Sequence, residues 1–142
     1  PTTALDIITQ AEILRLIKDL NEQQKVTVLL ISHNLGVIAN LAHKVVIMYC
    51  GKIAEIGDVM AIFQHPKHPY TAALLNSVPR LGLKELTTIK GEIPNPLHRP
   101  SGCPFHTRCA YAETICEKKE IELVEVGPSH FSSCLLVNRI YG

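Results

Sequence analysis

Val26-Thr27-Val28-Leu29-Leu30-Ile31 is the stretch that decides the expected fold, because it is a nearly unbroken run of β-branched residues and leucine. Such a run is typical of a strand that is buried on both faces of a parallel sheet. Ser32 and His33 follow it directly, and ligands of open α/β sheets bind beyond the carboxyl ends of the strands. Ser32 and His33 therefore form a candidate site, although a histidine taken alone at a strand end is more often structural than catalytic.

Helices and strands are expected to alternate up to about Pro79, which predicts an α/β domain over residues 1–79. An amphipathic helix is predicted over Thr9–Gln23, with apolar residues at helical spacing. Asn34 should cap a short helix, and Cys50-Gly51 should form the turn of a hairpin. Further elements are expected at Lys44–Tyr49, Lys52–Ile56, a helix that Asp58 caps and that ends near Gln64, and a helix from Pro69 to about Ser77.

Residues 80–142 have a different character, because prolines and glycines recur there and leave little room for long elements. Four of the five cysteines also lie in this part of the chain. A segment of this kind has little core of its own and should need a cross-link or a metal to hold it together. We therefore expect a small, loop-rich extension after the α/β part.

Composition excludes several classes of function. The 142 residues carry 14 Lys and Arg against 13 Asp and Glu, so that the net charge is +1, and aromatic residues make up only 5%. Neither value favours a nucleic-acid-binding surface. The longest apolar runs fall far short of the ~20 residues of a membrane helix, and no signal peptide begins the chain. A cytosolic location is the default expectation.

The first 35 residues resemble the ATPase domains of ABC transporters. In these domains a D-loop of the type PTxALD precedes a strand that ends in an ISHDL-type motif, and this chain has PTTALD at residues 1–6 and ISHNL at residues 31–35. The resemblance implies a RecA-like fold, a D-loop at the ATPase dimer interface formed by Ala4, Leu5 and Asp6, and His33 as the catalytic switch histidine that contacts the γ-phosphate of ATP. Asn34 replaces the more usual Asp, and both residues cap helices.

The remaining ATP-binding motifs of these domains are absent from the sequence. No GxxxxGK[ST] loop, LSGGQ signature or Q-loop occurs, and the catalytic Glu would lie just before Pro1. Without the loop, no set of backbone amides can hold a triphosphate. We therefore expect the C-terminal portion of a longer subunit, which binds ATP and Mg²⁺ as a whole, and we expect these 142 residues alone not to hydrolyse ATP.

Strings later in the chain resemble the ATPases of di- and oligopeptide importers. HPYT at residues 68–71 is followed by Leu74 and Leu75, GEIP occurs at residues 91–94, and residues 101–112 continue the match. A proline at the start of a helix would explain Pro69 but not the whole string. The resemblance implies ATP-driven peptide import at the cytoplasmic face of the membrane. The implied partners are a second ATPase subunit, transmembrane permeases and, indirectly, a peptide-binding protein.

Cys103, Cys109, Cys116 and Cys134 form a candidate metal site, with five, six and seventeen residues between successive members. Disulfides are disfavoured in a reducing cytosol. Structural zinc sites usually contain cysteine pairs that are two to four residues apart, whereas four widely spaced thiolates suit an iron–sulfur cluster. The resemblance to peptide importers also implies a [4Fe–4S] cluster, with zinc as the runner-up and free thiols as the remaining alternative. Cys50, His106 and His130 are not assigned as ligands.

Three functions remain open at this point. The chain could belong to an energy-coupling ATPase subunit, or act as a metal-cluster module in redox sensing or electron transfer, or be a structural metal-binding module at a subunit interface. The motifs around Asp6 and His33 favour the first function for the parent subunit. A reversible redox couple would favour the second function, and a cluster that is inert to reductants would favour the third.

Overall fold

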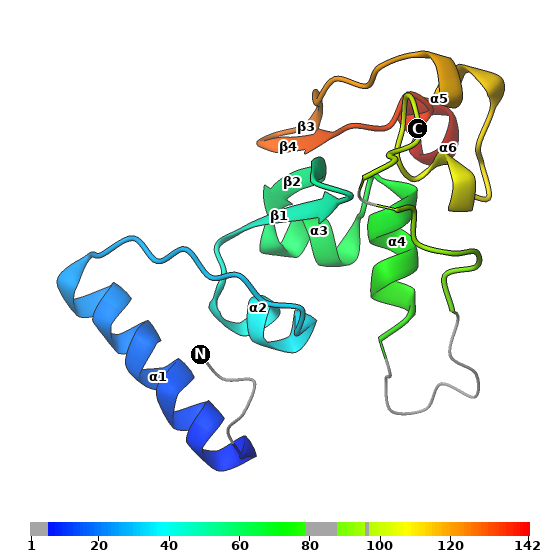
Figure 1. The fold of residues 1–142 in the computed structure, drawn as a ribbon. Coiled ribbons are helices and arrows are strands. Elements are labelled where there is room, and N and C mark those ends of the chain that lie inside the picture. Colours follow the sequence, from blue (N-terminus) through cyan, green and yellow to red (C-terminus); the bar gives the residue numbers. More distant parts are fainter. Residues whose placement is uncertain (1–5, 79–87, 96) are drawn as a thin grey trace. The chain divides into compact units, whose positions relative to one another are not determined.

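The computed structural model describes residues 6–78, 88–95 and 97–142, which form two units (Figure 1). Unit 1 is Pro1–Ala42 and unit 2 is His43–Gly142. The predicted boundary at residues 79 and 80 lies outside the described residues and stays a prediction.

Helix α1 of unit 1 spans Ile7–Gln24 and confirms the helix predicted at Thr9–Gln23. Lys25 caps its C-terminal end and has a left-handed φ of 54°. The apolar stripe that the sequence predicted is present but remains largely uncovered: Leu16 is 56% exposed and Leu20 is 49% exposed. In a stable globular unit such a stripe normally packs against a neighbouring element.

Residues 26–31 correct the central prediction, because they form no strand. Leu29 is 89% exposed and Ile31 is 88% exposed, so that the expected burial on two faces is wrong for this structure. A strand of a parallel sheet exists only when neighbouring strands satisfy its backbone groups. Within the described ranges, no segment pairs with residues 26–31.

Helix α2, Leu35–Leu41, follows as predicted. The Asn34 side chain accepts hydrogen bonds from the backbone N–H groups of Gly36 at 3.0 Å and Val37 at 3.2 Å. These bonds satisfy two amides that the first turn of a helix leaves free. The expected cap of this helix is therefore confirmed.

Unit 2 begins with the predicted hairpin of β1, Lys44–Tyr49, and β2, Lys52–Asp58. Cys50 and Gly51 have φ values of 47° and 74°, and a two-residue turn with two positive φ values matches the twist of paired strands. The pairing skips one residue, because Ile47 lies opposite Glu55 and Met48 lies opposite Ile53. The extra residue of this β-bulge places the consecutive residues Ala54 and Glu55 both in buried positions.

Two short strands from the C-terminal region complete the sheet. β3, Val124–Gly127, pairs with β4, His130–Ser132, and β4 pairs with β2, so that the order is β1-β2-β4-β3. Figure 1 shows β3 and β4, in orange, beside the hairpin. All three pairings are antiparallel. The described sheet is therefore antiparallel, as expected for the hairpin, whereas the parallel sheet predicted around residues 26–31 does not occur in the described ranges.

Short helices surround this sheet. α3, Val59–Gln64, follows β2, but the expected cap, Asp58, makes no side-chain capping bond; the N–H of Val59 donates instead to the carbonyl of His43 at 3.0 Å. α4, Pro69–Asn76, starts at the predicted proline. The C-terminal part adds η1 (His106–Arg108), α5 (Thr114–Lys118) and α6 (Val137–Tyr141), each five residues or fewer, as the composition predicted.

The core of unit 2 lies where these elements meet. Ile62 of α3 is fully buried, and Tyr49 of β1 stacks edge-on against Phe105 with ring centroids 5.3 Å apart. Tyr70 of α4 lies 4.6 Å from the Tyr49 ring. Phe105 comes from the Cys-containing region, so the aromatic contacts tie this region to the hairpin and α4. A search of the described helices for a stretch both long and apolar enough to cross a membrane finds none.

Candidate functional site

Asp6 is the described member of the predicted D-loop, and it caps α1; Ala4 and Leu5 lie outside the described residues. Its carboxylate accepts hydrogen bonds from the N–H groups of Ile8 and Thr9, each at 3.0 Å, and from the hydroxyl of Thr9 at 2.8 Å. The hydrogen bonds from Thr9 and Ile8 hold the pKa of Asp6 below its ordinary value. Asp6 thus has a structural task in this unit, and its role at a dimer interface stays a prediction.

His33 lies exposed at a bend directly before the Asn34 cap. The hydroxyl of Ser32 accepts a hydrogen bond from the N–H of Asn34 at 3.0 Å, which shapes this bend. In the described part of the chain, no hydrogen bond or ion pair involves the His33 ring or joins it to Asp6. The imidazole is therefore accessible to a ligand from outside this unit, but the structure does not test the catalytic role.

The four predicted cysteines line one mainly apolar cavity in unit 2, although they come from four different segments. Cys103 precedes η1, Cys109 ends it, Cys116 lies in α5, and Cys134 precedes α6. The cavity is also lined by His68, Pro69, Phe105, His106, Ala112, Leu135, Leu136 and Ile140. Cys50 lies apart in the hairpin turn, as the sequence suggested.

Backbone contacts hold two of these cysteines together. The N–H of Cys103 donates to the carbonyl of Cys116 at 2.8 Å. Gly102 makes this approach possible: its φ is +63°, and a Cβ there would lie 2.3 Å from the Cys116 oxygen. Only glycine fits both the left-handed backbone and the lack of space. Gly102 is a functional candidate that the sequence reasoning missed.

Burial disfavours the thiolate forms of three of these cysteines. The pKa of Cys103, Cys109 and Cys134 is raised, mainly by burial and further by the neighbouring thiols, and that of Cys134 reaches about 11. Metal ligands must be thiolates, and a bound cation reverses this preference. Within residues 6–78, 88–95 and 97–142, no three His, Cys, Asp or Glu side chains are arranged to hold a metal ion. The shared cavity thus offers the donors, but the predicted metal site is not supported by their present geometry.

Two histidines border this cavity, and they differ in whether Nδ1 carries a proton. His68 is the N-cap of α4, where its Nδ1 accepts a hydrogen bond from the N–H of Tyr70 at 3.1 Å. His106 Nδ1 lies 2.7 Å from the carbonyl oxygen of Cys103; because a carbonyl only accepts, Nδ1 carries the proton. A neutral imidazole donates from one nitrogen and accepts at the other. The proton of His68 is therefore on Nε2, and burial lowers the pKa of His68 to about 4, which keeps the ring neutral.

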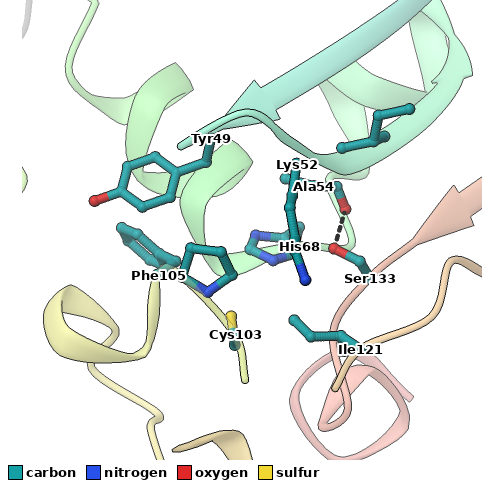
Figure 2. A pocket seen from close by; sticks show the side chains of 10 residues that line it. Tyr49, Lys52, Ala54, His68, Cys103, Phe105, Ile121 and Ser133 are labelled. Atoms are coloured by element: carbon teal, nitrogen blue, oxygen red, sulfur yellow. Dashed lines mark hydrogen bonds between the residues drawn. The ribbon is translucent and has the colours of Figure 1, made fainter. Parts of the chain in front are cut away.

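A second small pocket lies beside the cysteine cavity and shares its wall (Figure 2). His68, Cys103 and Phe105 line both spaces, so they form the partition between them. On the far side of this pocket, the hydroxyl of Ser133 donates to the carbonyl of Ala54 at 3.1 Å, drawn as a dashed line in Figure 2. This bond uses the carbonyl at the β-bulge and joins the C-terminal segment to β2.

Glu55 and His130 form a buried pair that the sequence analysis missed. Glu55 is fully buried, and its Oε1 lies 2.6 Å from His130 Nε2. The backbone N–H groups of Lys67 and His68 also donate to this carboxylate, at 2.6 Å and 3.0 Å. The sequence offered one signal, because Glu55 lies between two apolar residues of a strand. A charged residue in such a position is rarely buried without partners. The pair fixes the segment before α4, and hence His68, against β2 and β4.

Comparison with known proteins finds a family match for part of this sequence. Residues 54–116 match the family described as "Oligopeptide/dipeptide transporter, C-terminal region". This range includes Glu55, His68 and three of the four cysteines, but ends before Cys134. The match therefore covers most of the elements that surround the cysteine cavity.

Curated relatives match nearly the whole chain. The oligopeptide transport ATP-binding protein AppF of Bacillus subtilis is 43% identical over 96% of this chain and 43% of its own length. The dipeptide transport ATP-binding protein DppD of the same organism is 46% identical over 96% of the chain and 41% of its own length. DppD of Escherichia coli is 39% identical over 94% of the chain and 42% of its own length. The chain thus spans less than half the length of these relatives.

Proposed function

Because this chain belongs to the oligopeptide/dipeptide transport ATP-binding proteins, of which it matches the C-terminal part, we propose that it functions within an ATPase subunit that drives peptide import through an ABC transporter. The observation that carries this proposal is the similarity over nearly the whole chain to proteins that are all peptide-transport ATP-binding proteins. The proposed partners are a second ATPase subunit, transmembrane permeases and, indirectly, a peptide-binding protein. The proposed location is the cytoplasmic face of the membrane.

In this function, His33 contacts the γ-phosphate of ATP, and the D-loop at Ala4, Leu5 and Asp6 lies at the interface with the second ATPase subunit. The exposure of the His33 imidazole supports the first assignment. The exposed apolar side chains of residues 26–31 support a place for this segment in the RecA-like sheet of a complete ATPase domain, where neighbouring strands would cover them. ATP and Mg²⁺ are held by the complete domain, and the 142 residues alone do not hydrolyse ATP.

A chimera tests this function. Residues 1–142 would replace the matching region of the Escherichia coli dipeptide transport ATP-binding protein DppD, and dipeptide-dependent growth and ATP hydrolysis would be measured. The chimera should support growth, and His33→Ala should lower ATP hydrolysis by about 10²–10³-fold, the usual effect of losing one preorganised donor. His43→Ala, also at an exposed histidine, is the control. Full ATPase activity of the His33→Ala chimera would refute the assigned role.

We further propose that Cys103, Cys109, Cys116 and Cys134 hold a [4Fe–4S] cluster, with zinc as the alternative. The donor set fits either group chemically, because four thiols from separate segments line one cavity. The segments that carry them would have to rearrange to reach binding geometry. A cluster would supply either one-electron chemistry or a cross-link between these segments.

Anaerobic preparation of the chain, followed by iron, sulfide and zinc assays and a visible spectrum, tests the metal proposal. Each of the four Cys→Ser variants should reduce the bound metal, whereas Cys50→Ser should not. A reversible redox couple would favour a redox role, and a cluster inert to reductants would favour a structural one. A metal-free chain after reconstitution with iron and sulfide or with zinc would refute the proposal.

A further inference from the structure

Helix α6 forms one side of the cysteine cavity. Its N-cap, Leu136, and Ile140 within it line the cavity together with the four cysteines. Val137 of the same helix is only 7% exposed. Burial, and further the nearby Cys134 thiol, raises the pKa of Tyr141 at the end of the helix. The packing of α6 therefore closes this side of the cavity.

The segment before α6 allows the helix to move without disturbing the sheet. Ser133 is fixed to β2, because its N–H and its hydroxyl both donate to the carbonyl of Ala54, at 2.9 Å and 3.1 Å. From Cys134 onward, the backbone hydrogen bonds found among the described residues join only residues of this same segment. A helix of five residues has little stability of its own, so its contacts with other elements decide its position.

Two polar contacts hold α6 against its neighbours. Lys67 Nζ donates to the carbonyl of Tyr141 at 3.0 Å and lies 5.7 Å from the centroid of its ring. Arg139 forms an ion pair with Glu113, the N-cap of α5, which lies beside α6 (Figure 1). Across the described ranges, no other side-chain hydrogen bond or ion pair joins α6 to the rest of unit 2. The side chains of Arg139 and Glu113 are 72% and 40% exposed, so the Lys67 contact should be the stronger of the two.

We propose that α6 is a hinged lid over the cysteine cavity, and that its release admits small thiol-reactive molecules to the thiols that line the cavity. This inference goes beyond the proposed function and does not require that the cysteines bind a metal. Cys116 is only 8% exposed while the lid is closed. The reactive form is the thiolate, and burial raises the pKa of Cys134. Opening therefore gives a reagent access and also removes the burial that disfavours the reactive form.

Substitution of the Lys67 side chain tests the lid without disturbing the sheet, because the contacts of Lys67 with Glu55 and Ser132 use only its backbone. Lys67→Met keeps the apolar part of the side chain and removes the donor. The double variant Lys67→Met/Arg139→Met removes both polar contacts of α6. Lys18→Met is the control, because Lys18 also contacts a carboxylate but lies in α1 of unit 1.

The whole chain, reduced and free of metal, would be alkylated with iodoacetamide, and the rate at each cysteine would be measured by mass spectrometry. In this reaction the thiolate sulfur displaces iodide, and the thiol proton passes to the solvent. Lys67→Met should raise the rate at Cys116 about tenfold, the change expected when an opening equilibrium loses one charged hydrogen bond. The double variant should raise it further, and Lys18→Met should leave it unchanged.

Cys50 in the hairpin turn is an internal control, and its rate should not change in any of these variants. An unchanged rate at Cys116 in the double variant overturns the inference. A faster rate that is accompanied by faster amide exchange in β2 also overturns it, because the whole unit would then be loosened rather than the lid alone.

A second measurement needs no variant and covers the case in which Lys67→Met fails to fold. In the unsubstituted chain, the alkylation rate of Cys116 would be followed at urea concentrations well below the unfolding transition. Release of a five-residue helix exposes little surface, so the logarithm of the rate should rise with only a small fraction of the slope of global unfolding. A slope equal to that of global unfolding would overturn the inference, because Cys116 would then react only in the unfolded chain.

Discussion

Removing the Glu55 carboxylate should strongly destabilise unit 2. Three donors converge on this fully buried group: the N–H groups of Lys67 and His68, and His130 Nε2. Glu55→Ala would leave all three without an acceptor in a place that water does not reach. The expected result is a large loss of free energy of unfolding, together with loosening of the segment before α4.

The size of the effect follows from the contacts of Glu55. Each hydrogen bond to a charged acceptor contributes about 1.5–3 kcal/mol, which sets a gross value of roughly 5–9 kcal/mol for three bonds. The cost of burying the charge, several kcal/mol, offsets part of this. A net loss of about 3–5 kcal/mol is therefore expected for Glu55→Ala, which is roughly a 10²–10⁴-fold change in the folding equilibrium. Glu55→Gln should recover part of it, because one amide oxygen can still accept.

Urea unfolding monitored by circular dichroism, together with amide hydrogen exchange at Lys67 and His68, measures these effects. Glu120→Ala is the matched control, since Glu120 also contacts a cation, Lys52 at 2.9 Å, but its side chain is 82% exposed. The control should change neither stability nor exchange measurably. A Glu55→Ala protein that loses less than about 1 kcal/mol and keeps slow exchange at both amides would refute the reasoning.

Three further results are expected. Gly102→Ala should destabilise the chain and reduce metal loading, because the new Cβ would lie 2.3 Å from the carbonyl oxygen of Cys116. Gly127→Ala is the control, because its Cβ would lie an ordinary 3.7 Å from the nearest atom, the Cβ of His130. It should be tolerated in the same urea and metal assays. The neutral His68 should stabilise the metal-free chain above about pH 6.5, and this stabilisation should be lost as the pH falls from about 6.5 to about 4, because the unfolded chain then binds a proton that the folded chain excludes. The free energy of unfolding should therefore change by at most about 1.4 kcal/mol per pH unit. Urea titrations of His68→Asn without this slope would confirm the prediction, whereas an equal slope would contradict it. The cap that Asp6 provides is strongest when ionised, so α1 helicity measured by circular dichroism should fall as the pH decreases through its lowered pKa, and Asp6→Ala should abolish that change.

Local patterns were sufficient to predict most elements of the chain. Helix α1, the Asn34 cap, the Cys50-Gly51 hairpin and the proline that begins α4 each depend on residues close together in sequence. Their physical causes, side-chain capping and backbone φ preferences, act within a few residues. These predictions were therefore confirmed without any knowledge of the tertiary contacts.

Predictions that depended on distant partners were less successful. Residues 26–31 have the composition of a buried strand, but composition does not provide the neighbouring strands that such a segment needs. The pairing of β2 with β4 and the Glu55–His130 contact join residues about 75 positions apart, which no local pattern encodes. The sequence predicted a metal site at the four cysteines but not the cavity that they line, and His68 and Gly102 were missed because their roles depend on tertiary geometry.

The Glu55 contacts also have a consequence for the order of events during synthesis. Domains fold progressively as the ribosome extends the chain, and Glu55 emerges 75 residues before His130. Until β4 has been made, the hairpin carries a carboxylate on the face that will be enclosed, and closing that face early would bury an incompletely paired charge. The carboxylate therefore discourages premature collapse of a nascent chain that lacks its C-terminal strand. A product that ends before β4 would keep this face exposed, with its carboxylate incompletely paired. This part of the product would unfold locally, and proteases would then cleave it.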